Sequence, residues 1–488
     1  MTLSKLSIII VIAALIYSGV VIFILRKHKN WLITFLQAFC GLLFIISGWV
    51  KAIDPMGTGF KLEQYFNEFS AHLEPTWFSF FGPVLTELTL YQNSFSVFMI
   101  VLEIVLGVML LLGSWPKLTA WLFFLIVVFF TLLTGFTYLT GYVPMDSTFF
   151  QFSKWVAYDE TNMRVTDCGC FGDFMKLKPK ISFFKDLVLL VPAIIFIFGY
   201  TKFHTLLSPK IRLAIVTLTT LGTLYYCLSN YVWDLPDVDF RPFKEGVNIR
   251  ERKQAEQAAM ANVPITIKLQ ETATGKFVEI PMEQYSGDYA SEKYKFIAQI
   301  KGEPEIEHTK ISDFTFYDDD GNDASADALA HQGDQLMIVC YKLYADEEYT
   351  EVIVQDTLWR LDSLMIGDSL GTSKSVESIA EKKESVINFT WDTDYMQKFD
   401  KLIPFIQEAQ KEGVRSFILA GSAGLEKRNA FKAKLGLEIP IYEADDILLK
   451  TIIRSNPGVV WMKDGQVVKH WHIKQLPDYV KAKTIAGK

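Results

Sequence analysis

The sequence contains few cysteines, few histidines and no long basic segment. Among 488 residues there are five cysteines and seven histidines, and the formal net charge is -7. Proteins that bind nucleic acids usually carry a clustered basic surface. We therefore expect no nucleic acid partner.

Apolar residues, in contrast, are abundant and unevenly placed. Half of the chain is hydrophobic and the mean hydropathy is +0.21, which is too apolar for an ordinary soluble protein. Almost all of the excess precedes Asp234. The sequence thus predicts a membrane part followed by a globular part.

Six segments are long and apolar enough to cross a bilayer, which takes roughly 20 residues. They are 6–25, 31–50, 94–113, 118–142, 184–200 and 212–232. The first is interpreted as a permanent span, because "RKHKN" follows it and no clear cleavage site is present.

The segment 51–93 is interrupted by proline and glycine but rich in Phe, Leu and Trp. It predicts short helices along the membrane surface, or packing over the mouth of the bundle.

Basic residues predict the orientation of the bundle. They are dense in the short loops after spans one, three and five: Arg26, Lys27, Lys29, Lys117, Lys202, Lys210 and Arg212. The opposite loops hold more Lys and Arg in total, but over longer segments. Density near the helix ends marks the cytoplasmic side. Both termini and the loop that contains "DCGCFGD" are then outside the cytoplasm, where disulfides persist.

That loop places Cys168 and Cys170 one residue apart. A disulfide between them closes a small, strained ring, and strain makes a disulfide easier to reduce. Gly169 and Gly172 relax the backbone limits on such a loop. A thiol–disulfide exchange site is favoured over a structural pair. A zinc site is less favoured, because zinc needs four ligands and the loop offers two thiols and no histidine.

Charges around the two sulfurs leave their reactivity open. Asp167 and Asp173 should oppose thiolate formation unless Lys176 or Lys178 folds back. The two aspartates are candidate binding residues of the loop.

Three further candidate residues lie within the predicted spans. Glu103 is a functional candidate, because an ionisable group near mid-membrane is costly. It can hold a proton, bind a quinone-like head group, or hydrogen-bond a neighbouring helix. Cys40 and Cys227 could extend a thiol relay, but apolar cysteines are usually inert core residues.

The stretches "GWVKAIDPMGTGFKLEQYF" and "VTDCGCFGDFMKLKPKISFFKD", together with Glu103, resemble the DoxX family and its relative, the methylamine utilisation protein MauE. The resemblance covers about 31–200. It implies a four-helix membrane bundle, to which 1–30 and 201–238 add a first and a sixth span. It also implies a redox or disulfide-linked role, with Cys168 and Cys170 as the catalytic pair and Glu103 serving the bundle interior. A quinone is the candidate cofactor.

The second half divides into a small β-rich connecting module, 239–310, and a larger domain, 311–488. In the module, "VPITIKLQETATGKFVEIPM" predicts a hairpin that turns at "TATGK". In the larger domain, strands alternate with helices and end in a hairpin and a helix. This order resembles the thioredoxin fold, in particular its peroxiredoxin and TlpA-like branch. Pro457 matches the proline that opens the penultimate strand of that fold, commonly in a cis peptide.

The predicted thioredoxin-like domain lacks the Cys-x-x-Cys pair. Cys340 lies alone within a strand, and a lone thiol cannot cycle as a dithiol. An insert at 347–385 further displaces the usual site. We therefore expect a binding domain that grips an extended client beside Pro457.

His470 and His472 face one side of a strand. Solvated edge residues are favoured there over a metal pair.

The fold class expected from the sequence is a membrane α-helical bundle followed by an extracytoplasmic α/β thioredoxin-like domain. The favoured function is thiol exchange on the outer face of a bacterial inner membrane, with the C-terminal domain in the periplasm holding a protein client. The alternative is a non-enzymatic anchor or adaptor subunit of an envelope complex. A small-molecule carrier would rest on Glu103 and the number of spans alone, because no inverted repeat is evident.

Overall fold

The computed structural model describes residues 2–165, 169–302, 304–366 and 369–487. The chain forms two compact units, Met1–Arg241 and Pro242–Lys488. The boundary falls directly after the last long apolar helix and the short segment that follows it.

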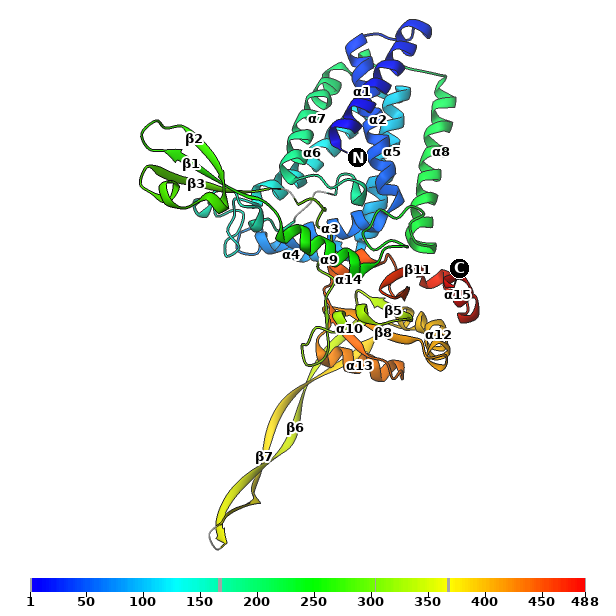
Figure 1. Cartoon of the computed structure of the whole chain (residues 1–488). Coiled ribbons are helices and arrows are strands. Elements are labelled where there is room, and N and C mark those ends of the chain that lie inside the picture. Colours follow the sequence, from blue (N-terminus) through cyan, green and yellow to red (C-terminus); the bar gives the residue numbers. More distant parts are fainter. Residues whose placement is uncertain (1, 166–168, 303, 367–368, 488) are drawn as a thin grey trace. The chain divides into compact units, whose positions relative to one another are not determined.

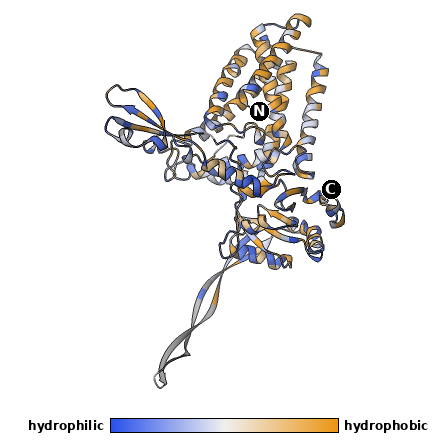
Figure 2. Ribbon diagram, viewed as in Figure 1, coloured by the Kyte–Doolittle hydropathy of each residue, from blue (hydrophilic) through white to orange (hydrophobic). Residues whose placement is uncertain are grey.

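The first unit is a bundle of long apolar helices (Figures 1 and 2). They are α1 (Leu3–Gly19), α2 (Trp31–Ile53), α5 (Gln92–Leu112), α6 (Pro116–Thr140), α7 (Pro179–Gly199) and α8 (Pro209–Leu228). With the short helical turns that extend α1, α5, α7 and α8, the described residues contain six helices long and apolar enough to cross a membrane. All six predicted spans are confirmed. The chain is therefore a multi-pass membrane protein in its first half.

Small residues bring α2 and α5 close together. A Cβ atom added to Gly41 would lie 2.9 Å from the carbonyl oxygen of Gly107, and one added to Gly48 would lie 2.6 Å from the Cγ1 atom of Ile104. Such close approach between membrane helices depends on small side chains at the contact. It also sets the distance between Lys51, one turn after Gly48, and Glu103, directly before Ile104.

The segment between α2 and α5 forms α3 (Pro55–Leu73), α4 (Gly82–Leu88) and short 3-10 turns, so the expected short helices are present. α3 lies crosswise at one end of the bundle (Figure 1) and buries Leu62, Tyr65 and Phe66. The stretch that follows behaves differently, because Trp77 and Phe80 are 78% and 61% exposed. α3 thus packs over the bundle, whereas 77–91 does not.

The second unit begins with a helix that the sequence analysis missed. α9 (Ile249–Ala261) begins at Asn248, whose side chain accepts a hydrogen bond from the Glu251 amide. It has no apolar stripe to reveal it. Instead, the buried carboxylate of Glu256 accepts hydrogen bonds from Thr309 and Ser312, which join α9 to residues 309–312. Polar contacts distant in sequence therefore stabilise this helix.

The module itself is a three-stranded antiparallel sheet in the order β2-β1-β3. Its strands are β1 (Ile265–Glu271), β2 (Phe277–Pro281) and β3 (Tyr294–Lys301). The predicted hairpin, with its turn at 272–276, is confirmed.

A six-stranded mixed sheet follows in the order β11-β10-β5-β8-β9-β4. Its strands are β4 (Phe316–Tyr317), β5 (Asp334–Cys340), β8 (Arg415–Gly421), β9 (Ile441–Ala444), β10 (Gly458–Lys463) and β11 (Gln466–His472). β5, β8 and β9 are parallel, and the other three strands pair antiparallel to their neighbours. The helices are α10 (Ser325–Ala330), α11 (Thr393–Gln397), α12 (Phe399–Lys411), α13 (Leu425–Leu435), α14 (Asp446–Ile452) and α15 (Tyr479–Ala486). The core joins Ile338 and Val459 of the sheet to Phe399, Phe431 and Tyr479 of the helices.

The insert at 347–385 belongs to a long two-stranded ribbon, β6 (Ala345–Ile366) and β7 (Ser369–Trp391), which Figure 1 shows as an extension of the chain. The sequence predicts an insert here but no hairpin. An isolated ribbon needs no buried face, and Tyr349 and Ile353 are 65% and 59% exposed. The strands of this ribbon therefore need not show the alternation of apolar and polar residues by which a half-buried strand is recognised in a sequence.

The prediction that His470 and His472 are solvated is wrong. They lie on the edge strand β11, yet they are only 5% and 6% exposed. The outer edge of β11 is covered, because the Gly246 amide donates to the Val467 carbonyl and the Val467 amide to the Val247 carbonyl. β11 is thus the last strand of the sheet, but it is not exposed to solvent.

Candidate functional site

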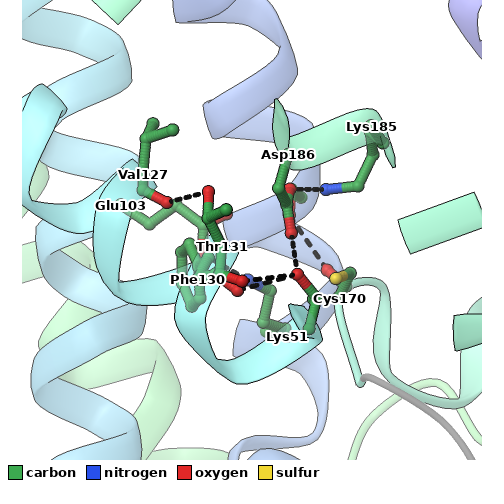
Figure 3. A network of polar contacts seen from close by, with 10 residues as sticks. Lys51, Glu103, Val127, Phe130, Thr131, Cys170, Lys185 and Asp186 are labelled. Carbon is green, nitrogen blue, oxygen red and sulfur yellow. Dashed lines mark hydrogen bonds and ion pairs between the residues drawn. The ribbon is translucent and has the colours of Figure 1, made fainter. Parts of the chain in front are cut away.

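Two ion pairs lie within the helical bundle, one buried and one partly buried (Figure 3). The Lys51 ammonium on α2 donates to the Glu103 carboxylate on α5 at 2.5 Å, and both side chains are at most 5% exposed. On α7, Lys185 donates to Asp186 at 2.5 Å. An ionised group inside a membrane bundle is tolerated when it is paired. Pairing with Lys51 thus explains how Glu103 is accommodated.

α6 joins the two pairs. The ring of Phe130 lies 4.9 Å from the Lys51 ammonium, a cation–π distance. One turn later, the Thr134 hydroxyl donates to the Asp186 carboxylate at 3.0 Å. Four helices, α2, α5, α6 and α7, therefore contribute to one buried polar network.

The network lines an open cavity, and about 850 Å³ of space there is not filled by atoms, including solvent at its mouth. α3 contributes Lys61 and Tyr65 to its wall. The remaining wall is mainly aromatic and aliphatic, with Phe44, Phe129, Phe130, Phe171, Leu133 and Leu189. A cavity with apolar walls and a few convergent polar groups is typical of a ligand-binding or active site.

Cys170 of the predicted loop lies at this cavity (Figure 3). The Ser47 hydroxyl of α2 donates to the Cys170 carbonyl at 3.0 Å, which fixes the backbone of the loop against the bundle. Gly169 and Gly172 have φ angles of 60° and 51°, in the left-handed region that favours glycine. The expectation that these glycines permit a tight loop is confirmed. Asp167 and Cys168 lie outside the described residues.

The surroundings of Cys170 act in opposite directions on its thiol. Desolvation is the largest effect and raises the pKa of Cys170 overall, and the Lys185 ammonium is the strongest charge that lowers it. Asp186 raises the pKa, while Lys51 and Glu103 have weaker and mutually opposed effects. Neither Lys176 nor Lys178 lines the cavity. The basic groups of α7 and α2 take the place that the sequence analysis assigned to those loop lysines.

The other residues singled out in the membrane part lie elsewhere. Asp173 is in a single 3-10 turn and does not line the cavity. Cys40 and Cys227 are fully buried in separate apolar clusters. Within the described ranges, no group of three or more His, Cys, Asp or Glu side chains is arranged to hold a metal ion.

In the second unit, Pro457 directly precedes β10, and the Asn456–Pro457 peptide is cis. Around it, the Lys398 ammonium donates to the Asn456 carbonyl at 3.0 Å, and the Asn456 amide donates to the Lys342 carbonyl at 2.8 Å. Cys340 ends β5 and is fully buried, and its burial raises the pKa of the thiol to about 12. Such a thiol stays protonated and unreactive at neutral pH.

The sequence alone indicates Glu103 and Cys170 as site residues, but it does not indicate Lys51, Lys185 and Asp186 as parts of their site. A signal was present, since "KD" at 185–186 places two ionisable residues early in an apolar span. Lys51 directly follows the predicted span 31–50, so the sequence indicates only a basic residue of the next loop. Contacts between helices distant in sequence, which no local pattern contains, brought these residues together.

No family model, curated protein or solved structure matches this chain. Its class therefore follows from the structure, as a multi-pass membrane protein whose second half carries a mixed sheet.

Proposed function

We propose that this chain is a membrane thiol–disulfide exchange protein of the DoxX/MauE type. The observation that carries the proposal is the position of Cys170, at a cavity that two lysine–carboxylate pairs also line. A cysteine that serves only as packing would not require charged side chains around it. Ionisable groups beside a thiol are the usual means of controlling its reactivity.

The exchange proceeds between the Cys168 and Cys170 thiols and a disulfide of a client protein. A thiolate attacks one client sulfur, the client S–S bond breaks, and the second client sulfur leaves as a thiolate that takes up a proton. The remaining thiol of the pair then displaces the client. The client is reduced to a dithiol and the pair is oxidised to a disulfide, and the reverse sequence oxidises the client.

In this proposal the second unit is a thioredoxin-like domain that binds the client beside Pro457. Support comes from the strand order, with three parallel strands flanked by antiparallel β10 and β11, and from helices alternating with the strands. Cys340 is the one cysteine of this unit, and it is buried. Binding without catalysis is the role that such a domain can fulfil.

A quinone is the cofactor class that suits the cavity in this account. Lys51 and Lys185 offer N–H donors for carbonyl oxygens, and the aromatic side chains of the wall suit a planar ring. When bound, a quinone would supply two-electron redox chemistry.

The proposed location is a bacterial inner membrane, with both termini and the cysteine loop on the periplasmic side. The dense basic residues after α1, α5 and α7 support this orientation. Reporter fusions after Lys117 and after Asp234 test it. A reporter that needs the cytoplasm should be active after Lys117 and inactive after Asp234, and the opposite result would contradict the orientation.

The function is tested in intact cells with the double variant Cys168→Ser/Cys170→Ser. Thiol labelling should show a changed oxidation state of at least one protein of the outer face. The variant Cys227→Ala, which alters a buried cysteine of α8, should leave that protein unchanged. If the double variant leaves every outer protein in its wild-type oxidation state, the exchange function is wrong.

A second candidate is a non-enzymatic adaptor that anchors a binding domain within an envelope complex. It is favoured by the buried, single cysteine of the second unit. Affinity purification of the double serine variant distinguishes the two. An adaptor would retain a stable set of partners and would change no thiol in the cell.

A further inference from the structure

We propose that Cys170 is the attacking cysteine of the loop and that Lys185 is the positioning residue that makes its thiolate accessible. This inference deepens the exchange function proposed above and rests on it for its biological role. Its chemistry can nevertheless be measured on the purified full chain without any client.

The position of Lys185 carries the argument. Lys185 lies in the second turn of α7, its side chain is 20% exposed, and it lines the same cavity as Cys170. Its ammonium lies 6.0 Å from the ring of Phe171, the residue that follows Cys170. Figure 3 shows the Cys170 side chain beside the Lys185–Asp186 pair. The charge is thus held next to the cysteine loop by a rigid helix.

The loop is fixed to the same framework. Ser47 holds the Cys170 carbonyl, and the close approach of Gly169 to the Lys61 side chain places that part of the loop against α3. A Cβ atom at position 169 would lie 3.2 Å from the Lys61 Cγ atom. Cys170 and Lys185 are therefore both positioned by packed helices, so the interaction between them does not depend on a flexible surface side chain.

Every charged group at the cavity contributes to the balance around the thiol. Lys51 of α2 is engaged by Glu103 of α5, and Lys61 of α3 donates to the Gln64 amide oxygen at 3.1 Å. Lys185 and Asp186 of α7 remain as the pair next to Cys170, and they have opposite signs. Because the surroundings are apolar, a single charge there acts strongly on the thiol. Removal of Lys185 and removal of Asp186 must then have opposite consequences.

This opposition distinguishes an electrostatic role from a merely structural one. If the pair only held α7 in place, loss of either partner would loosen the site and alter Cys170 in the same direction. Asp186 also accepts from Thr134, and an Asn side chain at this position has an oxygen that can accept the same bond. Asp186→Asn therefore removes the charge and keeps the contact between α6 and α7.

The experiment is the pH profile of iodoacetamide alkylation of Cys170 in the purified full chain, in a Cys168→Ser background. Peptide mass spectrometry isolates the Cys170 adduct from those of the buried Cys40, Cys227 and Cys340. Lys185→Met should slow alkylation at pH 7 about tenfold and move the midpoint to higher pH, because one unit of thiol pKa changes the thiolate fraction tenfold. Asp186→Asn should move the midpoint to lower pH. Lys185→Arg should keep the rate within about twofold, since it preserves the charge.

Lys180→Met is the matched control, because Lys180 is an exposed residue of the same helix and does not line the cavity. It should leave the profile unchanged. The inference is overturned if Lys185→Met leaves the midpoint in place, or if Lys185→Met and Asp186→Asn shift it in the same direction. A normal alkylation profile in Lys185→Met, combined with the cellular effect of the double serine variant, would reject this inference and keep the exchange function.

Discussion

At the scale of single residues, the membrane part is defined by where its charges are paired. Lys51 and Glu103 satisfy each other across α2 and α5, and the Phe130 ring covers the ammonium. A buried pair of this kind adds little net stability compared with apolar packing, but it becomes costly when one partner is removed. Replacing one of the two residues should therefore destabilise the protein, whereas replacing both with apolar residues should be tolerated.

The variant Lys51→Met should lose about 3–5 kcal/mol of unfolding free energy, because it leaves the Glu103 carboxylate buried and unpaired. The double variant Lys51→Met/Glu103→Leu should recover most of that loss. Denaturant unfolding in detergent, arranged as a double-mutant cycle, measures the coupling. The exposed pair Lys268 and Glu279 of the second unit is the control, and its coupling should stay below about 1 kcal/mol. Equal losses in the single and double variants would contradict the pairing.

In the second unit, Glu256 should make the stability of the fold depend on pH in the acidic range. Burial raises the pKa of this carboxyl, but hydrogen bonds from Ser312, Thr309 and Arg252 outweigh burial and lower it overall. A lowered folded pKa means that the stabilisation is complete above the unfolded value of about 4.3 and is lost as the pH falls through the folded pKa.

Glu256→Gln should therefore destabilise α9 by about 2 kcal/mol at pH 7, a typical value for hydrogen bonds to a charged group. The difference from wild type should disappear at a pH below the folded pKa. Hydrogen exchange of the α9 amides at several pH values, in the full chain, reports this locally. An unchanged exchange rate at neutral pH would show that the Glu256 contacts do not hold the helix.

At the scale of elements, α3 packs against the bundle, whereas the stretch 77–91 exposes large apolar side chains. Leu90 and Tyr91 are 71% and 59% exposed, and they directly precede α5, which has 21 residues. An α-helix of that length measures roughly 32 Å, which matches the hydrocarbon core of about 30 Å. The stretch 77–91 must then lie outside the core, and its Trp, Phe and Tyr side chains suit the interface with water.

A photoreactive phenylalanine analogue in place of Trp77 or Phe80 should therefore capture phospholipid in native membranes. The same analogue in place of Tyr349, which is also well exposed but lies in the β6–β7 ribbon, should capture none. Mass spectrometry of the adducts decides the matter. Capture of protein at Trp77 and Phe80, in place of lipid, would mean that this stretch is covered by a partner.

At the scale of the whole molecule, the elements with a local periodic pattern could be predicted from the sequence. The features that depend on contacts between distant residues could not. The six spans and, apart from the β6–β7 ribbon, the strands and helices after Asp334 follow from apolar length and periodicity, and the structure contains them in the predicted order. α9 was missed because its stabilising partners, Thr309 and Ser312, lie some fifty residues away. The polar network was only half predicted for the same reason. Glu103 and Cys170 could be recognised by residue type, whereas Lys51 and Lys185 required the packing of the bundle.

The most direct test of the account is to trap the exchange reaction in intact cells. The Cys168→Ser variant retains the Cys170 thiol but lacks the thiol that releases the client, so it should accumulate a mixed disulfide with an outer protein that is visible without reductant. The Cys170→Ser variant should accumulate no such adduct. An adduct that forms only through Cys170 is the predicted result. The absence of any adduct in the Cys168→Ser variant, or an equal amount in both variants, would contradict the claim that Cys170 exchanges disulfides at this cavity.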